Sequence, residues 1–158
     1  MNDEARYETL QTPIGELFVL ASADRLLSIG FSEPKRKRAA SPIASKTIGL
    51  LDEYFRGDRV DFSALPFAMP PQPFYRTTLQ ALLAISYGSR LTYGDLAALA
   101  GNAKAYRAAA SAIANNPFAI AVPCHRIVPK SGGVGAYGWG ASKKAWLLHH
   151  EAINCAEV

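Results

Sequence analysis

The pair Cys124-His125 is the part of this sequence best suited to covalent chemistry. It lies in the run PCHRIV at residues 123–128, where a proline precedes the thiol and an arginine follows the imidazole. Cysteine attacks as a thiolate, and a neighbouring imidazole and guanidinium are groups that lower the pKa of a thiol. The motif therefore predicts a nucleophilic cysteine, although these residues alone do not say what it attacks.

A buried core thiol is the alternative interpretation of Cys124, because free cysteine is often buried and the apolar run AIAV at 119–122 comes just before the motif. The sequence after the motif, PKSGGVGAYGWG at 129–140, favours the reactive interpretation. Its glycines suit a loop whose backbone approaches a ligand closely. We therefore expect Cys124 to face a pocket formed by this loop.

The elements that must position the motif fall into two groups. Short apolar patterns predict antiparallel strands near 7–10, 17–20 and 26–29, and helical spacing follows at 43–55. A basic cluster, PKRKR at 34–38, is interpreted as a solvated loop with some attraction for DNA. Prolines between 61 and 73 predict an extended connector. The prediction is an α+β protein with an N-terminal domain at 1–68 and a C-terminal domain at 69–158.

The second group is helical. Residues 74–85 predict one helix, and Thr92 with Asp95 has the spacing of a capping box that opens a short helix ending at Gly101. Residues 103–114 predict a further, alanine-rich helix, so the pair has the outline of a helix-turn-helix. By itself, the alanine-rich composition favours a tight helix–helix contact over a DNA contact.

Composition and charge exclude several classes. The two cysteines, Cys124 and Cys155, are not expected to form a disulfide, and the adjacent Cys-His and His-His pairs lack the spacing of zinc ligands, so we predict no metal. The N-terminus resembles no targeting peptide, and no apolar run reaches membrane-spanning length, which predicts a cytoplasmic protein without a membrane partner. A net charge of +4 permits an anionic partner but does not require one.

Several segments, in order and spacing, resemble the O6-alkylguanine-DNA alkyltransferases, also called methylated-DNA–protein-cysteine methyltransferases. They are PCHRIV, YGDLA at 93–97, GNAKAYRA at 101–108, NP at 116–117 and WLLHHE at 146–151. The match is dense from about 74 to 151 and looser before it, mainly in TPIG at 12–15. The resemblance implies a ribonuclease-H-like antiparallel sheet with a helix, then a helical domain containing a helix-turn-helix, in a protein that acts as a monomer.

The resemblance also implies the chemistry, which is DNA repair without a cofactor. An alkyl group moves from O6-alkylguanine, and also from O4-alkylthymine, to Cys124 in a single turnover. His125 would draw the thiol proton through a water, Glu151 would orient His125, and Tyr93 would hydrogen-bond the guanine ring. Asn116 would brace the turn before the motif. Without the resemblance, Glu151 would be interpreted as a surface carboxylate and Tyr93 as a structural residue.

The resemblance implies binding to double-stranded DNA through the minor groove. The damaged nucleotide must leave the stack, which costs roughly a few kcal/mol. Arg107 would fill the gap that it leaves. The expected DNA contacts are Arg107, Ala105, Ala108, Ala109, Ser111 and Tyr93.

The predicted base pocket consists of Ile127, Tyr137, Gly138 and Trp139. In the family, the main-chain carbonyls of Cys124 and Ile127 and the amide of Gly138 read the base. Trp139 departs from the family pattern, which usually has glycine there. We hypothesise that the indole narrows the pocket or stacks on the base, and disfavours bulky O6-benzyl adducts.

Three rival functions remain at this point. A non-transferring relative would lack the cysteine, which is present as Cys124. A sequence-specific regulator would need polar base-reading side chains, and the alanine-rich helix has few. A Cys-His-Glu thiol hydrolase would use the same residues but turn over repeatedly.

Overall fold

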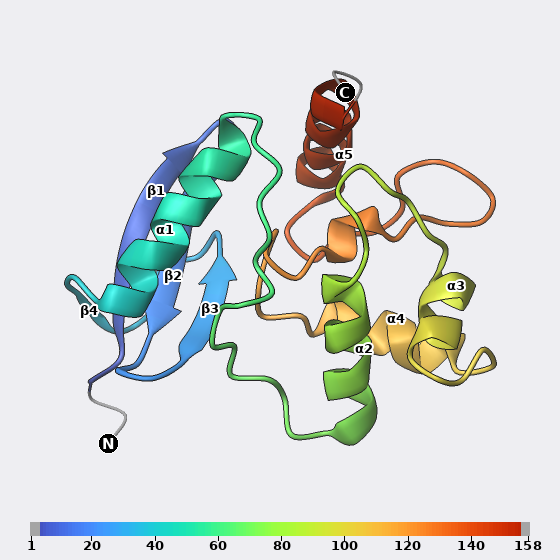
Figure 1. Ribbon diagram of the computed structural model, residues 1–158, viewed down its shortest axis with the longest axis horizontal. Helices are drawn as coiled ribbons and strands as arrows, with labels where there is room; N and C mark the ends of the chain where they lie inside the picture. The colour runs from blue at the N-terminus through green and yellow to red at the C-terminus, as the bar shows by residue number, and fades with distance from the viewer. Residues whose placement is uncertain (1–3, 156–158) are drawn as a thin grey trace. The chain divides into compact units, whose positions relative to one another are not determined.

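The computed structural model describes residues 4–155, which form two compact units (Figure 1). The first unit runs to Ala68 and also contains Pro117–Ala121, and the second contains Met69–Asn116 and the chain from Val122 onward. Within residues 4–155, no helix has the length and apolar character needed to cross a membrane.

The segment Pro117–Ala121 differs from the prediction, which placed it in the C-terminal domain. The Ile29 amide donates to the Pro117 carbonyl at 2.9 Å, and the Ile29 carbonyl accepts from the Ala119 amide at 2.9 Å. Phe118 is fully buried, with its ring centroid 4.9 Å from that of Phe67. The segment therefore extends the sheet and the core of the first unit.

The sheet of the first unit has the strand order β3-β2-β1-β4. The strands are β1 (Arg6–Thr12), β2 (Gly15–Ala21), β3 (Leu26–Gly30) and β4 (Lys37–Arg38). The first three form the predicted antiparallel meander. In contrast, β4 pairs parallel to β1, where the sequence predicted only a loop. Two consecutive cationic residues have no apolar alternation from which a strand could be predicted.

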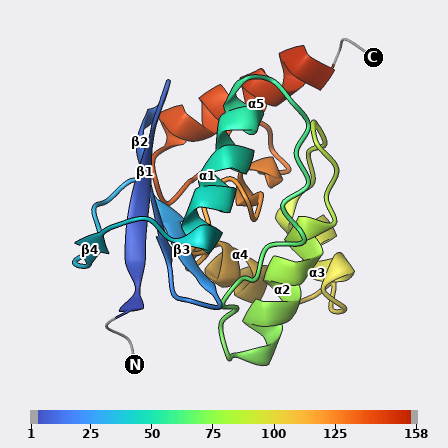
Figure 2. The ribbon, with the colours of Figure 1, turned by 60° about the vertical axis from the view of Figure 1, so that its left-hand side comes forward.

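One helix, α1 (Pro42–Phe55), packs against β1 and β2 (Figures 1 and 2). Leu51 and Tyr54 on α1 and Leu17 and Val19 on β2 are fully buried and form the core of this unit. The helix ends just before Gly57, whose φ of 100° is a conformation that costs glycine little.

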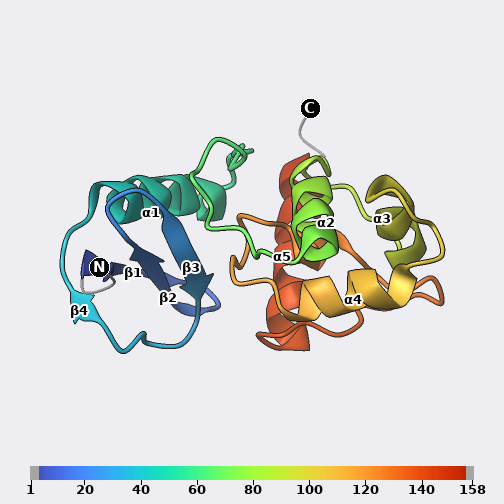
Figure 3. The ribbon, with the colours of Figure 1, turned by 90° about the horizontal axis from the view of Figure 1, so that it is seen from below.

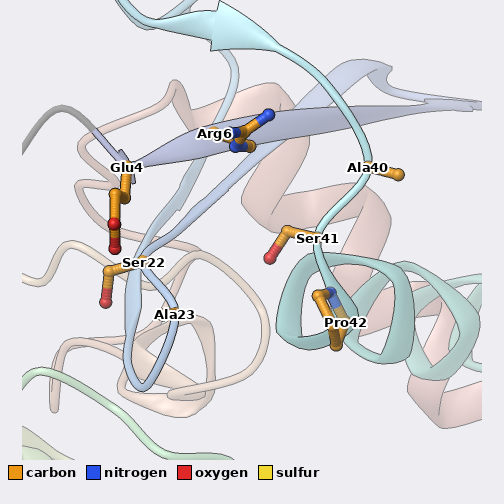
Figure 4. Close-up of a pocket in the computed structure, with 7 residues that line it drawn as sticks. All are labelled: Glu4, Arg6, Ser22, Ala23, Ala40, Ser41 and Pro42. Atoms are coloured by element: carbon orange, nitrogen blue, oxygen red, sulfur yellow. The ribbon is translucent and has the colours of Figure 1, made fainter.

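A hollow of about 240 Å³ lies beside the N-terminus of α1 (Figure 4). It is lined by Glu4, Arg6, Ser22, Ala23, Ala40, Ser41 and Pro42. The Ser41 hydroxyl accepts from the Ala44 amide at 3.5 Å, and the Ser41 amide donates to Glu8 at 3.1 Å. Its lining contains no cysteine or histidine, so this hollow lacks the residue types that the chemistry expected of Cys124 requires.

The second unit is helical (Figure 3). Its elements are α2 (Pro73–Leu83), α3 (Tyr93–Leu99), α4 (Tyr106–Ala114), the short 3-10 helix η2 (Cys124–Arg126) and α5 (Ala141–Cys155). The predicted capping box is confirmed, since the Asp95 amide donates to Thr92 Oγ1 at 3.1 Å and the Thr92 amide donates to Asp95 Oδ2 at 2.9 Å. The fourth helix begins at Tyr106 rather than at 103, because Asn102 Oδ1 accepts from the Lys104 amide and forms a turn there.

Ile120 has an unusual backbone conformation. Its φ is 70°, and it is the one residue other than glycine with positive φ among those described. The Ala121 amide donates to the Ala119 carbonyl at 2.7 Å across it, which is the pattern of a strained γ-turn. The side chain is 1% exposed, so packing holds a conformation that a β-branched residue avoids in isolation.

This strain predicts an inverted order of stability for two variants. Ile120→Gly and Ile120→Ala both lose the buried side chain, but only glycine adopts positive φ without a steric penalty. We expect the glycine variant to have the larger free energy of unfolding, by about 1 kcal/mol, in urea titrations. In ordinary strand or helix positions alanine is the more stable of the two, so equal stabilities or an advantage for alanine would contradict the strain.

Candidate active site

Cys124 begins η2 and is buried, with 2% of its surface exposed. Asn116, predicted as a bracing residue, lies against it: Asn116 Nδ2 is 3.2 Å from Cys124 Sγ and 3.1 Å from the Val122 carbonyl oxygen. One amide group thus contacts both the thiol and the backbone that leads to it. Asn116 therefore places the sulfur.

His125 and Glu151 form a buried pair. His125 Nε2 lies 2.6 Å from Glu151 Oε2, and their side chains are 0% and 1% exposed. Burial alone would raise the pKa of Glu151, but the hydrogen bonds from His125 and Arg126 and the charge of Arg126 outweigh it and hold that pKa well below its ordinary value. An ionised carboxylate only accepts, so Nε2 of the imidazole is the protonated nitrogen.

The other imidazole nitrogen, His125 Nδ1, is buried and has no hydrogen-bond partner within residues 4–155. Burial lowers the pKa of His125, and the charges of Arg126 and Lys144 act in the same direction, while Glu151 opposes them. The ring is therefore neutral near pH 7, with a lone pair on Nδ1. A neutral imidazole held in one tautomer by a carboxylate can act as a general base.

Arg126 has a role that the sequence did not predict. Its Nε and Nη2 donate to Glu151 Oε1 and Oε2 at 2.9 and 3.1 Å, and its Nη1 donates to the Ile85 carbonyl at 2.7 Å. The expectation that this guanidinium lowers the thiol pKa is wrong, because the group is bound to Glu151. Its position two residues after the cysteine gives no sign of a partner on a distant helix.

The pKa of Cys124 is raised to about 11, chiefly because burial disfavours the thiolate. The hydrogen bond from Asn116 and the charge of Lys144 act against burial but do not overcome it. Cys124 is therefore a thiol near pH 7, although the motif had suggested a lowered pKa, and it becomes nucleophilic only when its proton is removed.

Lys144 on α5 is a second residue that the sequence analysis missed. It is 1% exposed, and its Nζ donates to the carbonyls of Ile127 and Ala136 at 2.6 and 3.1 Å. Burial lowers the pKa of Lys144, and the nearby Cys124 opposes that shift. Lys144 lies on the same helix face as the buried Leu147, Leu148 and Glu151, and a lysine within an apolar stripe was the signal available in the sequence.

The two Lys144 contacts tie the loop after the motif to the motif itself. Gly135 has a φ of 80°, and a Cβ there would lie 2.7 Å from Pro129 Cδ and 3.6 Å from Lys144 Nζ. The loop therefore closes tightly on its own beginning, and only glycine fits at this position.

Three of the predicted pocket residues belong to this loop and Ile127 lies just before it, and the four differ in exposure. Ile127 and Tyr137 are buried, Trp139 is half-buried and Gly138 is exposed. The Tyr137 and Trp139 rings meet edge-on, with centroids 5.2 Å apart. Burial raises the pKa of Tyr137 well above its ordinary value, with further contributions from Cys124 and Glu151, and its hydroxyl has no partner within residues 4–155.

Tyr93, at the start of α3, is half-buried. Burial raises the pKa of its phenol, and the nearby Cys124 raises it further. The phenol is therefore protonated near pH 7 and can donate a hydrogen bond.

Apart from Tyr93 on α3, the residues predicted to contact DNA lie on or just before α4, but they are not equally accessible. Arg107 and Ala108 are exposed and Ala105 is half-buried. Ala109 is 0% exposed because its side chain packs in the core, so it is not part of the surface on which the sequence had placed it. The Ser111 hydroxyl is hydrogen-bonded to the hydroxyl of Tyr75, which leaves it less free for a DNA contact.

Within residues 4–155, no three histidine, cysteine or carboxylate side chains come together as metal ligands would. The described site instead joins Cys124, Asn116, His125, Glu151, Arg126 and Lys144 through direct contacts or charge.

Both halves of the chain match models of one protein family. Residues 5–69 match the model described as 6-O-methylguanine DNA methyltransferase, ribonuclease-like domain, and residues 73–153 match 6-O-methylguanine DNA methyltransferase, DNA binding domain. The constitutive methylated-DNA–protein-cysteine methyltransferase of Bacillus subtilis is 34% identical over 162 residues, which cover 96% of this chain and 98% of that protein.

Solved structures of proteins with related names are also similar to this chain. The crystal structure of Mycobacterium tuberculosis O6-methylguanine methyltransferase has a TM-score of 0.84 at 31% identity and covers 95% of this chain and 94% of that chain. A crystal structure of Mycobacterium tuberculosis OGT in complex with DNA has a TM-score of 0.85 at 30% identity, with 94% of each chain covered.

The buried carboxylate predicts how stability depends on pH. The folded-state pKa of Glu151 is depressed, so its contribution is present above its ordinary pKa of 4.5 and is lost as pH falls below that value. Glu151→Gln leaves Arg126 without its counter-charge, and we expect a loss of about 3–5 kcal/mol near pH 7 in urea unfolding.

The same variant should have a flatter loss of stability between about pH 5 and about pH 3 than the unaltered protein, because one depressed carboxylate has been removed. Glu53→Gln, at an exposed carboxylate on α1, is the matched control and should change neither quantity appreciably. If Glu151→Gln behaved like Glu53→Gln, the conclusion that Glu151 is ionised while buried would be refuted.

Proposed function

The chain belongs to the 6-O-methylguanine DNA methyltransferase family, and on that premise we propose that it repairs DNA by moving an alkyl group from O6-alkylguanine to its own Cys124. The resemblance found in the sequence and the predicted α+β fold class are confirmed by the same comparisons. The proposed activity is that named for the relatives, a methylated-DNA–protein-cysteine methyltransferase.

The single observation that supports transfer best is a buried thiol beside a histidine whose tautomer a carboxylate sets. Because Cys124 is protonated near pH 7, the reaction begins with loss of its proton to His125 Nδ1, through one water. The imidazolium that forms is stabilised by Glu151, which lies 2.6 Å from Nε2. This follows the logic of a nucleophile, a base and an orienting carboxylate.

The thiolate then attacks the alkyl carbon. A carbon–sulfur bond forms, the bond between the carbon and guanine O6 breaks, and the electron pair leaves with the guanine. The Tyr93 phenol, protonated because burial raises its pKa, stabilises the leaving base by donating to it. The product is a thioether, which has no acyl carbon for water to attack, so the protein reacts once.

In this proposal the target base is held by the pocket of Ile127, Tyr137, Gly138 and Trp139. O4-alkylthymine is a second substrate of the same reaction. The Cys124 carbonyl already accepts from the Ile127 amide at 3.2 Å, and the Ile127 carbonyl accepts from Lys144 at 2.6 Å. A carbonyl oxygen has two lone pairs, so each can still accept from the base.

The proposed partner is double-stranded DNA, bound through the minor groove by the exposed side of α4. Arg107 fills the gap left by the extruded nucleotide, and Ala105 and Ala108 let the helix backbone approach. One copy of the chain suffices, because it supplies the nucleophile, the base and the orienting carboxylate. The cytoplasmic location stays a prediction.

Intact-mass measurement tests the transfer directly. After incubation with duplex DNA that contains O6-methylguanine, we expect the protein to gain one methyl group in a stoichiometric fraction, and Cys124→Ala to gain none. Repeated release of product without a mass gain would identify a thiol hydrolase instead. DNA binding with neither a gain nor any turnover would identify a non-transferring protein.

Trp139 predicts a preference for small adducts. Its ring lies edge-on against the buried Tyr137, so it occupies space beside the base pocket. Trp139→Gly should raise the rate of transfer from O6-benzylguanine relative to O6-methylguanine, by roughly tenfold if about 1.4 kcal/mol of steric cost is removed. The two rates are measured on the free bases, and an unchanged ratio would reject this role for the indole.

A further inference from the structure

The second unit contains a hollow of about 540 Å³ that the proposed transfer does not account for. It lies where α3 and α4 begin, and Figure 3 shows the start of α4 beside α3. The hollow is lined by Thr92, Tyr93, Gly94, Asp95, Tyr106 and Lys130. Of these residues, only Tyr93 has a part in the proposed chemistry.

Tyr106 is the large apolar side chain at the beginning of an alanine-rich helix. It is 50% exposed, and it is followed on α4 by the sequence RAAASAIA. A single exposed aromatic side chain needs no explanation by itself. Here, however, the ring borders a hollow that a second tyrosine also lines, and such rings are the surfaces on which unstacked nucleic-acid bases lie.

The Tyr106 ring is also next to the residue proposed to enter the duplex. The guanidinium carbon of Arg107 lies 6.0 Å from the ring centroid, within the range of a cation–π contact. When Arg107 moves into the base stack, its guanidinium leaves this ring. The same movement of Arg107 thus fills the gap in the DNA and leaves the Tyr106 ring open to another partner.

The polar groups of the hollow fit a base better than a bare phosphate. Asp95 accepts from the Thr92 amide, and the hydrogen bonds from Thr92, followed by the charge of Lys130, lower the pKa of Asp95. The hollow therefore presents an ionised acceptor together with a cationic donor. A phosphate would be repelled by the Asp95 carboxylate, whereas the edge of a base carries both donors and acceptors.

We propose that this hollow binds one unstacked base adjacent to the lesion, with that base stacked on the Tyr106 ring. The inference rests on the proposed function, because the lesion base itself goes to Cys124 and a neighbouring base remains for the hollow. Tyr106 is then a specificity residue that recognises locally opened DNA.

Binding to an oligonucleotide with one O6-methylguanine, measured in a Cys124→Ala background, tests the stacking. Stacking on an aromatic side chain is worth about 1–3 kcal/mol per base, so Tyr106→Ala should raise Kd by roughly 5- to 150-fold. Tyr106→Phe keeps the ring, and its Kd should stay close to that of the parent. Leu99→Ala removes a 58% exposed apolar side chain from α3 outside the hollow, and should also leave Kd unchanged.

Abasic substitution then distinguishes a base from the backbone. The base is removed from each nucleotide flanking the lesion in turn, and Kd is measured with and without Tyr106→Ala. At one position, base loss should weaken binding of the parent and abolish the effect of Tyr106→Ala. The proposal is overturned if the alanine effect persists with every abasic oligonucleotide, or if Tyr106→Phe loses as much affinity as Tyr106→Ala.

A separate measurement keeps this inference apart from the proposed function. With Cys124 present, Tyr106→Ala should accept methyl from free O6-methylguanine base at the rate of the unaltered protein, because no flanking base is involved. A slower rate would show that the substitution disturbs the transfer site and would overturn the assigned role. Failure of the unaltered protein to accept methyl from any substrate would refute the proposed function, while the binding measurements would still decide the role of Tyr106.

Discussion

The arrangement of the transfer site depends on one buried carboxylate. Glu151 accepts hydrogen bonds from His125, from Arg126 and from the Gly88 amide, the last at 3.0 Å. These donors lie in η2 and in the segment between α2 and α3, while Glu151 belongs to α5, so one side chain joins three parts of the unit. An unpaired charge at 1% exposure would cost several kcal/mol, and the folded state therefore requires all of these partners together.

Glu151 is ionised although it is buried, whereas burial keeps the Cys124 thiol protonated. A carboxylate surrounded by donors stays ionised, whereas Cys124, with a weak donor and no bound cation, stays protonated. A thiol of high pKa is slow to react with oxidants and other electrophiles, since the thiolate is the reactive form. In the proposed reaction, this low reactivity protects the attacking thiol until a substrate and His125 act on it together.

Two cationic side chains of the site have a structural role. Arg126 is bound to Glu151 and to the Ile85 carbonyl, and Lys144 joins the Ile127 and Ala136 carbonyls. Neither contacts the sulfur in these interactions, and of the two it is Lys144 whose charge lowers the thiol pKa. Their main effect is to hold the motif and the loop after it in one arrangement, which is the requirement for in-line attack on a bound alkyl carbon.

Local patterns in the sequence were sufficient for much of the fold. Alternation gave the meander of β1 to β3, helical spacing gave α1 and α2, and the Thr92-Asp95 spacing gave the cap of α3, because each reflects backbone preferences within a few residues. The motif around Cys124, together with its resemblance to a family, identified the nucleophile and named His125, Asn116 and Glu151 as companions. None of these inferences required the distance between two segments.

Tertiary structure decided everything that depends on distant segments meeting. It paired β4 with β1, returned Pro117–Ala121 to the first unit and buried Ala109, none of which has a local signal. It also bound Arg126 to Glu151, 25 positions away, so that this guanidinium does not lower the thiol pKa as the sequence had suggested. The sequence by itself therefore determined which residues are candidates for the reaction, whereas burial and charge pairing, which exist only after packing, decided that Cys124 is a thiol and that His125 is neutral near pH 7.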